Sequence, residues 1–348
     1  MKRRALCSAA LAFALCAAGC AGTTLHRIVT VPVEGGLQVQ ETSTWVYAEK
    51  ETIETSPNVR TVTRMTDFQG ERDAYFPEVS PDGRWVAFAI RQPDAPGREP
   101  VYNLWCVETR GGHALRQLTD SNALNLHPAW SPDSRFIYFA SNRIGRVSHI
   151  WRISQSGGGG ITQVTTSTTW DQEPSVSGKA GDQIAFSATD GRTAREEVWT
   201  VRSDGSFLTQ IVRGMEPSVS PDGESIAFTV LDPASDEVHL WTMRADGSER
   251  TQLTYSEGHL EGVQDRSPSW SPDGDWLAFA SDRGKDRSGR RNFDIWVVCS
   301  DGSRLTQLTT NGSYDMSPTW GPDGRYIYFQ SNRGLSWDIW RLEADLPR

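Results

Sequence analysis

A seven-residue motif, Pro-x-x-Ser-Pro-Asp-Gly in its commonest form, occurs six times along this 348-residue chain. Repetition limits the possible folds more than any single residue does, because each copy forms the same supersecondary unit. The third copy keeps Pro174 but has Gly178 where the others have a second proline. The copies begin at Pro77, Pro128, Pro174, Pro217, Pro268 and Pro318, with spacings of 51, 46, 43, 51 and 50 residues. We therefore expect six equivalent structural units.

Each unit carries the signals of four β-strands. The motif leads into the first strand, and a short apolar run such as Trp276–Ser281 provides the second. A third run contains an apolar residue followed by tryptophan, and the fourth follows a Gly-rich turn and usually reads Gln-apolar-Thr. Short apolar runs bounded by turn residues are typical of strands. Four strands per repeat predict an all-β fold, a six-bladed β-propeller with four-stranded blades.

The fourth strand of the last unit is missing from its expected place, because the chain stops soon after Trp340. An upstream segment, Thr61-Val-Thr-Arg-Met-Thr66, looks like the Gln-Leu-Thr runs of the other units. We predict that this N-terminal strand completes the last blade and closes the ring. Closure removes the sheet edges that an open ring would expose. The predicted propeller spans residues 61–348 as one domain.

The first 20 residues have the features of an export signal. Basic residues at 2–4 precede an apolar stretch that is too short to span a membrane. The sequence Ala17-Ala-Gly-Cys20 resembles the lipobox of bacterial lipoproteins, which implies lipidation of Cys20. The alternative is an ordinary signal peptide that is cut nearby. We expect residues 21–60 to form a tether with a small hairpin at Gly35–Gly36, and Ala21 favours an outer-membrane anchor facing the periplasm.

Charge and cysteine usage exclude several classes of partner and framework. The net charge of -9 and the pI near 5.3 argue against nucleic acid or an anionic membrane surface as the main partner. After Cys20 only Cys106 and Cys299 remain, in units that are not neighbours in the predicted ring. We therefore expect no disulfide framework.

The repeated polar residues have structural interpretations. Ser-Pro-Asp-Gly favours a type I turn, and one carboxylate per turn is far from the cage of oxygens that calcium needs. The position two residues before each third-strand tryptophan is always polar, so we expect a structural role for it, including its two histidines. The sequence suggests that the arginines of Ser-Asx-Arg partner this position within a blade. Its six occupants are Asn103, His149, Glu197, His239, Asp294 and Asp338.

The candidate site consists of residues that lead into the first strands. In a propeller the first strand lines the central channel, so these residues are expected to converge on one mouth. A ring of carboxylates there would focus the electrostatic potential, whereas the alternative is a set of solvated turn residues. The basic insertion at residues 284–293 is expected to be a solvated surface loop, and the alternative is contact with a partner or with phospholipid headgroups. The predicted mouth residues are Asp73, His127, Trp170, Asp171, Glu173, Glu216, Asp265, Arg266 and Asp315.

Taken together, the repeats over residues 61–348 resemble those of the TolB family, the periplasmic six-bladed propeller of the Tol-Pal envelope system. The resemblance rests on the Pro-x-Trp-Ser-Pro-Asp-Gly, Asp-Ile-Trp and Gln-Leu-Thr segments. Related repeats occur in prolyl oligopeptidase-like and tricorn-type proteases and in oligogalacturonate lyases. The chain has no counterpart of the α/β domain that precedes the TolB propeller, so contacts with inner-membrane Tol proteins are not implied. Binding of an envelope partner, such as a peptidoglycan-associated lipoprotein, is implied.

These observations lead to three hypotheses of function. The first is a monomeric, non-enzymatic envelope lipoprotein that binds a protein partner at the acidic mouth, with no cofactor, metal or catalytic residue. The second is a metal-dependent oligouronide lyase, against which stands the presence of only His127 near the mouth. The third is recognition of carbohydrate or peptidoglycan by Tyr75, Phe76 and Trp170. A serine hydrolase is disfavoured because the sequence has no Gly-x-Ser-x-Gly elbow.

Overall fold

The computed structural model describes residues 56–346 except 69–71, 93–99, 111–114, 158–159, 177–181, 257–259, 286–288 and 335, together with the backbone of residues 28–33 and 36–41. The predicted signal segment and Cys20 lie outside the described residues. The chain divides after Ile53 into two units. In the first unit, strands β1 (Ile28–Val33) and β2 (Gly36–Glu41) pair as an antiparallel hairpin, at the place where the sequence suggests one.

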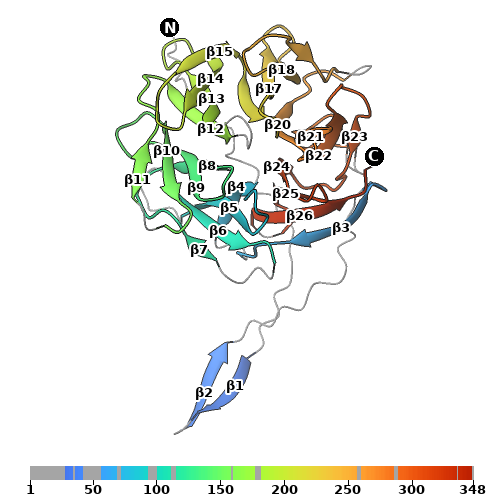
Figure 1. The fold of residues 1–348 in the computed structure, drawn as a ribbon. Coiled ribbons are helices and arrows are strands. Elements are labelled where there is room, and N and C mark those ends of the chain that lie inside the picture. The colour runs from blue at the N-terminus through green and yellow to red at the C-terminus, as the bar shows by residue number, and fades with distance from the viewer. Residues whose placement is uncertain are drawn as a thin grey trace, which may run out of the picture. The chain divides into compact units, whose positions relative to one another are not determined.

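The second unit is a six-bladed propeller of four-stranded antiparallel sheets (Figure 1). In each blade the first strand lies nearest the central axis and the fourth at the rim. Blades 1 to 6 take their first strands from β4 (Asp73–Val79), β8 (Asn125–Trp130), β12 (Trp170–Val176), β16 (Met215–Val219), β20 (Asp265–Trp270) and β24 (Asp315–Trp320). The predicted all-β class and blade number are confirmed.

The remaining strands follow in the order that the repeats predict. Second strands are β5 (Trp85–Arg91), β9 (Phe136–Ser141), β13 (Gln183–Thr189), β17 (Ser225–Asp232), β21 (Trp276–Ser281) and β25 (Tyr326–Ser331). Third strands are β6 (Tyr102–Glu108), β10 (His149–Ser154), β14 (Glu196–Arg202), β18 (Glu237–Arg244), β22 (Asp294–Cys299) and β26 (Asp338–Ala344). Rim strands are β7 (Arg116–Gln117), β11 (Ile161–Gln163), β15 (Thr209–Arg213), β19 (Thr251–Gln252), β23 (Thr306–Gln307) and β3 (Val59–Arg64).

The N-terminal strand β3 closes the ring, as predicted. It pairs antiparallel with β26, so the first and last strands of the ring share one sheet. Val62 is buried and packs in one cluster with Leu342 and Phe329. Just beyond the strand, Thr66 Oγ1 donates to Asp338 Oδ1 at 2.8 Å and accepts from the Ile339 amide at 3.0 Å. Thr309 makes the same two contacts in blade 5.

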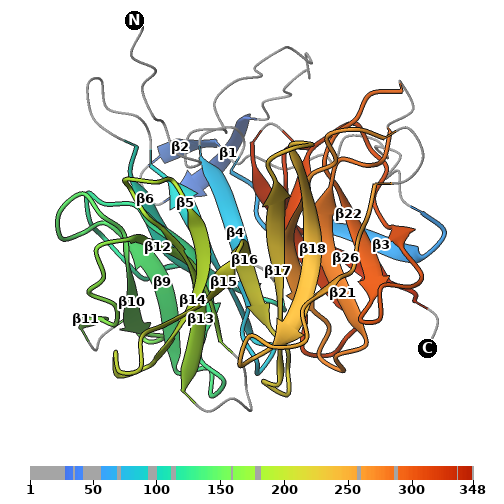
Figure 2. The ribbon, with the colours of Figure 1, turned by 90° about the horizontal axis from the view of Figure 1, so that it is seen from above.

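Each blade contributes one fully buried phenylalanine from its second strand to the core. Phe279, for example, lies opposite Trp296 in the register of β21 and β22. The apolar faces of neighbouring blades pack against each other, and the sheets stand side by side around the axis (Figure 2). Burial of one such ring contributes about 1.5–3 kcal/mol. The six rings are Phe88, Phe139, Phe186, Phe228, Phe279 and Phe329.

The Ser-Pro-Asp-Gly segments are the corners between first and second strands. In blade 5, Ser271 Oγ donates to Asp273 Oδ1 and accepts from the Trp276 amide at 2.9 Å. Asp273 Oδ1 also accepts from the Asp275 amide at 3.2 Å. Gly274 has a φ of 79°, which a residue without Cβ adopts at little cost. The predicted turn role is therefore confirmed.

Cys106 is buried, Cys299 is partly buried, and both are free thiols, as the repeat positions predict. Among the described residues, no helix is long and apolar enough to cross a bilayer.

Ring closure can be tested with one charge placed on either face of β3. Val62→Asp buries a carboxylate in the core and should lower the free energy of unfolding by about 3 kcal/mol or more. Thr63→Asp puts the same charge on the exposed face of the strand and should change it by less than about 1 kcal/mol. Urea unfolding followed by tryptophan fluorescence measures both. Equal effects would show that β3 does not pack as described.

Candidate functional site

Every first strand contains a β-bulge directly before its proline. The register shifts by one residue there, and the residue before the proline has a φ between 50° and 56°. This left-handed conformation costs a residue other than glycine roughly 1–3 kcal/mol, and strain of this kind clusters at functional sites. The six positions surround the axis and are Phe76, His127, Glu173, Glu216, Ser267 and Ser317.

Side chains tie several of these bulges to the neighbouring blade. Glu173 Oε2 accepts from the amide of Glu216 at 3.1 Å and from Ser187 Oγ at 2.6 Å. Glu216 Oε2 in turn accepts from the amide of Ser267 at 2.8 Å and from Thr229 Oγ1 at 3.1 Å. The bulge amides of blades 4 and 5 are thus bound by carboxylates of the preceding blade. These bonds fix the inner edges of three blades relative to one another.

Blades 3 to 5 form an acidic side near the axis. Glu173, Glu196 and Glu216 are half-buried and share the field of one cation, Arg266. Burial raises the pKa of all three carboxyls, and that of Glu216 reaches about 7. The charge of Arg266 lowers the pKa of Glu216, while the neighbouring Glu173 raises it. Near pH 7 Glu216 is therefore partly protonated, and it releases its proton when a further cation approaches.

Blades 6, 1 and 2 form an aromatic side. The ring of Tyr75 lies 6.1 Å from that of Phe76, 6.0 Å from that of Tyr102 and 5.8 Å from that of Trp337. The ring of Phe76 lies 4.1 Å from that of His127. Burial lowers the pKa of His127 to about 4, so this imidazole is neutral at pH 7. The surroundings of the axis are therefore apolar and aromatic on one side and acidic on the other.

Three of the predicted mouth residues are not exposed. Asp171, Asp265 and Asp315 are fully buried, so they cannot line an open acidic mouth. Asp265 accepts from Ser281 Oγ at 2.6 Å and from Arg283 Nη2 at 2.5 Å. A carboxylate at the start of an inner strand faces the protein interior, where nearby hydroxyls and, in blades 5 and 6, the arginine of Ser-Asx-Arg satisfy it. The expectation of a complete carboxylate ring is wrong.

The arginines of Ser-Asx-Arg also have partners other than those predicted. In blades 2, 5 and 6 these arginines bind a residue of the first strand. They do not bind the polar residue that lies two positions before the third-strand tryptophan. We call this unit the arginine latch: an arginine that donates to a first-strand Asn or Asp and stacks between two rings. Arg333 Cζ lies 5.2 Å from the Phe329 ring centre and 5.1 Å from that of Trp340. The three latches are Arg143 with Asn125, Arg283 with Asp265, and Arg333 with Asp315.

The other predicted residues are partly accessible: Asp73, His127, Trp170, Glu173, Glu216 and Arg266. Asp73 Oδ1 accepts from the amide of Trp337 at 3.0 Å, which ties blade 1 to blade 6. Arg266 Nη2 donates to Gln264 Oε1 at 2.9 Å. His149 and His239 contact the buried aspartates of the next blade, in agreement with a structural role.

Three further residues of this region are not among the predicted ones, namely Glu196, Trp337 and Glu78. Burial raises the pKa of Glu78 to about 7. Glu78 and the bulge residues have a sequence signal, because they flank the first proline of the motif. Glu196 and Trp337 have none, since they lie at or directly before the start of third strands and approach Arg266 and Tyr75 only through the packing of the chain.

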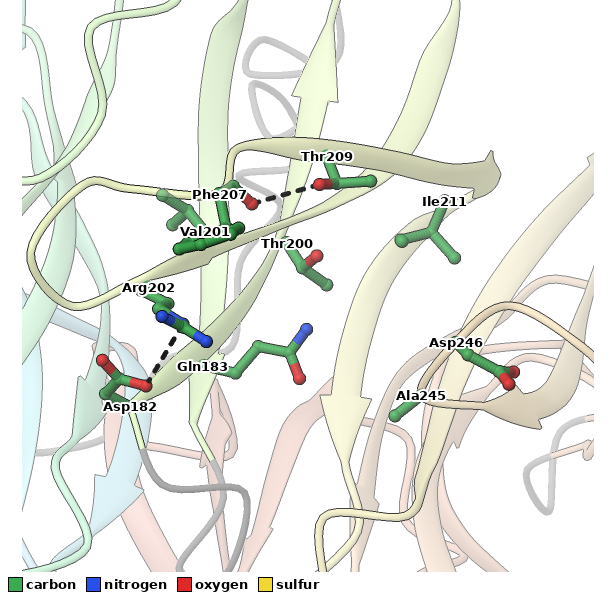
Figure 3. Close-up of a pocket in the computed structure, with 10 residues that line it drawn as sticks. All are labelled: Asp182, Gln183, Thr200, Val201, Arg202, Phe207, Thr209, Ile211, Ala245 and Asp246. Carbon is green, nitrogen blue, oxygen red and sulfur yellow. Dashed lines mark hydrogen bonds and ion pairs between the residues drawn. The ribbon is translucent and has the colours of Figure 1, made fainter.

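A separate groove of about 420 Å³ lies at the opposite end of the ring, between blades 3 and 4 (Figure 3). Phe207 is 69% exposed there, and the Cζ atom of Arg202 lies 4.1 Å from the centre of its ring. Asp182 pairs with Arg202 at 3.9 Å. Within the described ranges, no group of three or more His, Cys, Asp or Glu side chains is arranged to hold a metal ion.

The six blades, the closing strand and the repeated corners can be compared with known families. A family model described as the TolB β-propeller domain matches residues 51–262 and 261–346. The chain belongs to this family. An uncharacterized protein from Agrobacterium fabrum is 31% identical over 117 residues, 34% of this chain. The matched part is 36% of that protein, so this chain spans only about a third of the length of this curated relative.

Two solved structures show the breadth of this propeller fold. TolB from Acinetobacter baumannii aligns with a TM-score of 0.55 and 19% identity, over 81% of this chain and 66% of that one. An oligogalacturonate lyase from Vibrio parahaemolyticus aligns with a TM-score of 0.56 and 13% identity, over 92% of this chain and 97% of that one. At these identities the likeness concerns the fold alone. Because the fold is common to TolB and to a lyase, it does not by itself separate binding from catalysis.

The arginine latch predicts a large effect of one substitution in blade 5 of this TolB-family propeller. Arg283→Met leaves the Asp265 carboxylate buried without its cation and should lower the free energy of unfolding by about 3–5 kcal/mol. The double variant with Asp265→Asn should recover part of this loss. Arg304→Met, at an exposed site of the same blade, is the control. Urea unfolding of wild type, of the single variants Arg283→Met and Asp265→Asn and of the double variant measures the coupling; additive effects of the two substitutions would contradict a latch.

Glu216 predicts a pH dependence of stability. Its folded-state pKa of about 7 lies above the ordinary 4.5, so the folded protein binds this proton more tightly than the unfolded chain. The resulting stabilisation is complete below about pH 4.5 and is lost as the pH rises to about 7. Glu216→Gln should therefore gain stability over wild type between pH 5 and pH 8, by up to about 3 kcal/mol.

Urea titrations at the two pH values measure this gain. Glu224→Gln, at an exposed position of blade 4, is the control. Its free energy of unfolding should differ from that of wild type by the same amount at both pH values. If Glu216→Gln behaves like this control, the carboxyl is not held in its protonated form.

Proposed function

We propose that this chain is a non-enzymatic protein-binding module of the bacterial cell envelope. The partner binds at the end of the ring where the first and third strands of each blade begin, which we call the entry face. The observation that carries the proposal is the pairing of an acidic side with an aromatic side near the axis. Rigid blades position both sides, and protein-binding surfaces favour aromatic anchors with a few placed charges.

The two sides favour a partner with apolar groups and at least one basic group. Tyr75 and Phe76 offer ring surface on one side, and Glu173, Glu196 and Glu216 offer carboxyl oxygens on the other. Because burial raises the pKa of Glu216 to about 7, this carboxyl costs little to cover while it is protonated. A basic group of the partner would displace the proton and form charge-assisted hydrogen bonds. Binding at this site is therefore expected to release protons.

The N-terminal sequence supports an envelope location. Residues 1–20 read as an export signal, and the lipobox-like sequence supports Cys20 as the lipid anchor, with residues 21–60 as the tether to the propeller. Anchored in this way at the outer membrane, the propeller would meet partners in the periplasm. The resemblance to TolB supports a peptidoglycan-associated lipoprotein as the class of partner. Oligouronide lyase chemistry is not part of the proposal, since among the described residues no metal-binding group supports it.

Site-specific crosslinking tests this proposal with two aromatic positions. Tyr314 is 41% exposed next to the start of β24, on the entry face, and Phe207 is 69% exposed at the opposite end. Replacing either with benzoylphenylalanine keeps an aromatic side chain. In cells, the probe at Tyr314 should capture one discrete envelope protein, and the probe at Phe207 should not. Equal capture from both positions, or capture from Phe207 alone, would contradict binding at the entry face.

The captured partner can then be tested with purified proteins. Tyr75→Ala removes a central ring of the aromatic side and should weaken binding at least about tenfold, as truncation of an interface anchor commonly does. Phe207→Ala is the matched control and should leave the affinity unchanged. If Tyr75→Ala and Glu216→Gln both bind as wild type does, the partner uses another surface.

A further inference from the structure

Blade 3 lacks the arginine latch although it keeps the rings that sandwich the arginine in other blades. In the strand registers, Ala188 stands where the latch serines Ser141, Ser281 and Ser331 stand. Two residues further on, Asp190 takes the place of the latch arginine. Phe186 and Trp199 remain opposite each other, as the ring pairs of the latched blades do. Blade 3 therefore has the aromatic half of a latch without its cation.

The first-strand carboxylate of blade 3 is satisfied without an arginine. Asp171 Oδ2 accepts from Thr165 Oγ1 at 2.5 Å and from Ser167 Oγ at 2.6 Å. Thr169 Oγ1 donates to Asp171 Oδ1 at 2.7 Å. Three hydroxyls thus replace the serine and arginine of the latch. The loss of the arginine leaves no buried carboxylate unpaired, so blade 3 tolerates it.

A pocket of about 440 Å³ lies where the latch arginine would stand. Its walls include Trp199, Glu197, Asp190, Thr169, Arg192 and Arg195. Trp199 is half-buried, and in the described part of the chain no arginine stacks on it. By contrast Trp151, Trp296 and Trp340 each have a latch arginine within 5.1–5.8 Å of their ring centres. The third-strand tryptophan thus stacks on a guanidinium in three blades, whereas in blade 3 it faces a pocket.

The pocket carries charges of both signs around this ring. Trp199 Nε1 donates to Glu197 Oε2 at 3.2 Å, which fixes the ring and places a carboxylate at its edge. Asp190 accepts from the Arg192 amide at 2.8 Å and from Thr193 Oγ1 at 3.1 Å. Arg192 and Arg195 lie on the exposed turn that forms the outer wall. The two carboxylates suit a cation that enters over the ring, and the two arginines suit an anion beside it.

We propose that this pocket binds an arginine side chain of a partner, within an arginine-acidic sequence. The incoming guanidinium stacks on Trp199 and donates to Asp190 and Glu197, as the latch arginines stack on their tryptophans in the other blades. The acidic neighbour pairs with Arg192 and Arg195. A planar guanidinium fits better than an ammonium, which is compact and strongly hydrated. The pocket adjoins Trp170, since a Cβ on Gly191 would lie 3.5 Å from its indole nitrogen. The proposal does not depend on the partner proposed for the entry face.

Nuclear magnetic resonance of ¹⁵N-tryptophan-labelled protein tests this inference directly. The Trp199 indole N–H resonance is identified by its loss in Trp199→Phe. Titration with N-acetyl-arginine amide should shift this resonance in a saturable way, and the capped dipeptide Arg-Asp should bind more tightly. The Trp151 resonance should stay in place, because its own latch arginine covers the ring. N-acetyl-citrulline amide, which has the same shape without the charge, should bind at least about tenfold more weakly.

A variant that fills the pocket from within provides the second test. The double substitution Ala188→Ser and Asp190→Arg, on either side of Thr189, restores the serine and the arginine of the latch in blade 3 and should reduce arginine binding at least about tenfold. Asp232→Arg is the matched control, because Asp232 caps a similar turn in blade 4 through the Ala234 amide and Ser235 Oγ. This control should bind arginine as wild type does.

Three outcomes would overturn the proposal. Equal shifts with citrulline amide would show that charge is not recognised. A shift with N-acetylglucosamine and none with arginine would assign the pocket to a sugar. An unmoved Trp199 resonance throughout the arginine titration would show that no ligand of this class binds.

Discussion

Pairing between β3 and β26 is the contact on which the rest of the propeller depends. It joins the two ends of the ring through one sheet and buries Val62 in the core of the last blade. Without it, blade 6 would expose an unpaired strand edge. The other features follow from closure, since the six inner strands meet around one axis only when blade 6 lies beside blade 1. The bond from the Phe76 amide to Gln330 Oε1, at 2.7 Å, spans this junction.

Within the closed ring, the six blades share one backbone arrangement. They differ in the side chains that pair with the polar residues of their first strands. Blades 2, 5 and 6 use an arginine latch, and in blades 5 and 6 its partner is a buried aspartate, so that removing the arginine leaves one charge alone and is strongly destabilising. Blades 1, 3 and 4 lack this Ser-Asx-Arg sequence and vary more. The acidic cluster around Arg266, the aromatic rings around Tyr75 and the pocket at Trp199 all draw on those blades. Function is therefore expected where the repeat is least regular.

The periodic part of the structure could be predicted from the sequence with good accuracy. Strand order, the turn at Ser271-Pro272-Asp273-Gly274 and the closing strand all follow from local signals that recur from unit to unit. The candidate site could be predicted only in part. His127, Glu173 and Glu216 do gather near the axis, whereas Asp171, Asp265 and Asp315 are buried. Exposure of a side chain depends on its neighbours in the next strand and blade, which one repeat read alone does not contain.

The sequence by itself thus determined the blade number, the four strands of each blade and the way the ring closes, because these depend on periodicity and on short-range turn chemistry. Only the tertiary structure decided which carboxylates are buried beside an arginine and which remain partly accessible near the axis, because that depends on how strands pack within a blade and against the next blade. The tertiary structure also decided which position of the repeat Asp190 occupies. In the sequence this residue is a turn aspartate, and in the fold it occupies the place of a latch arginine beside Trp199.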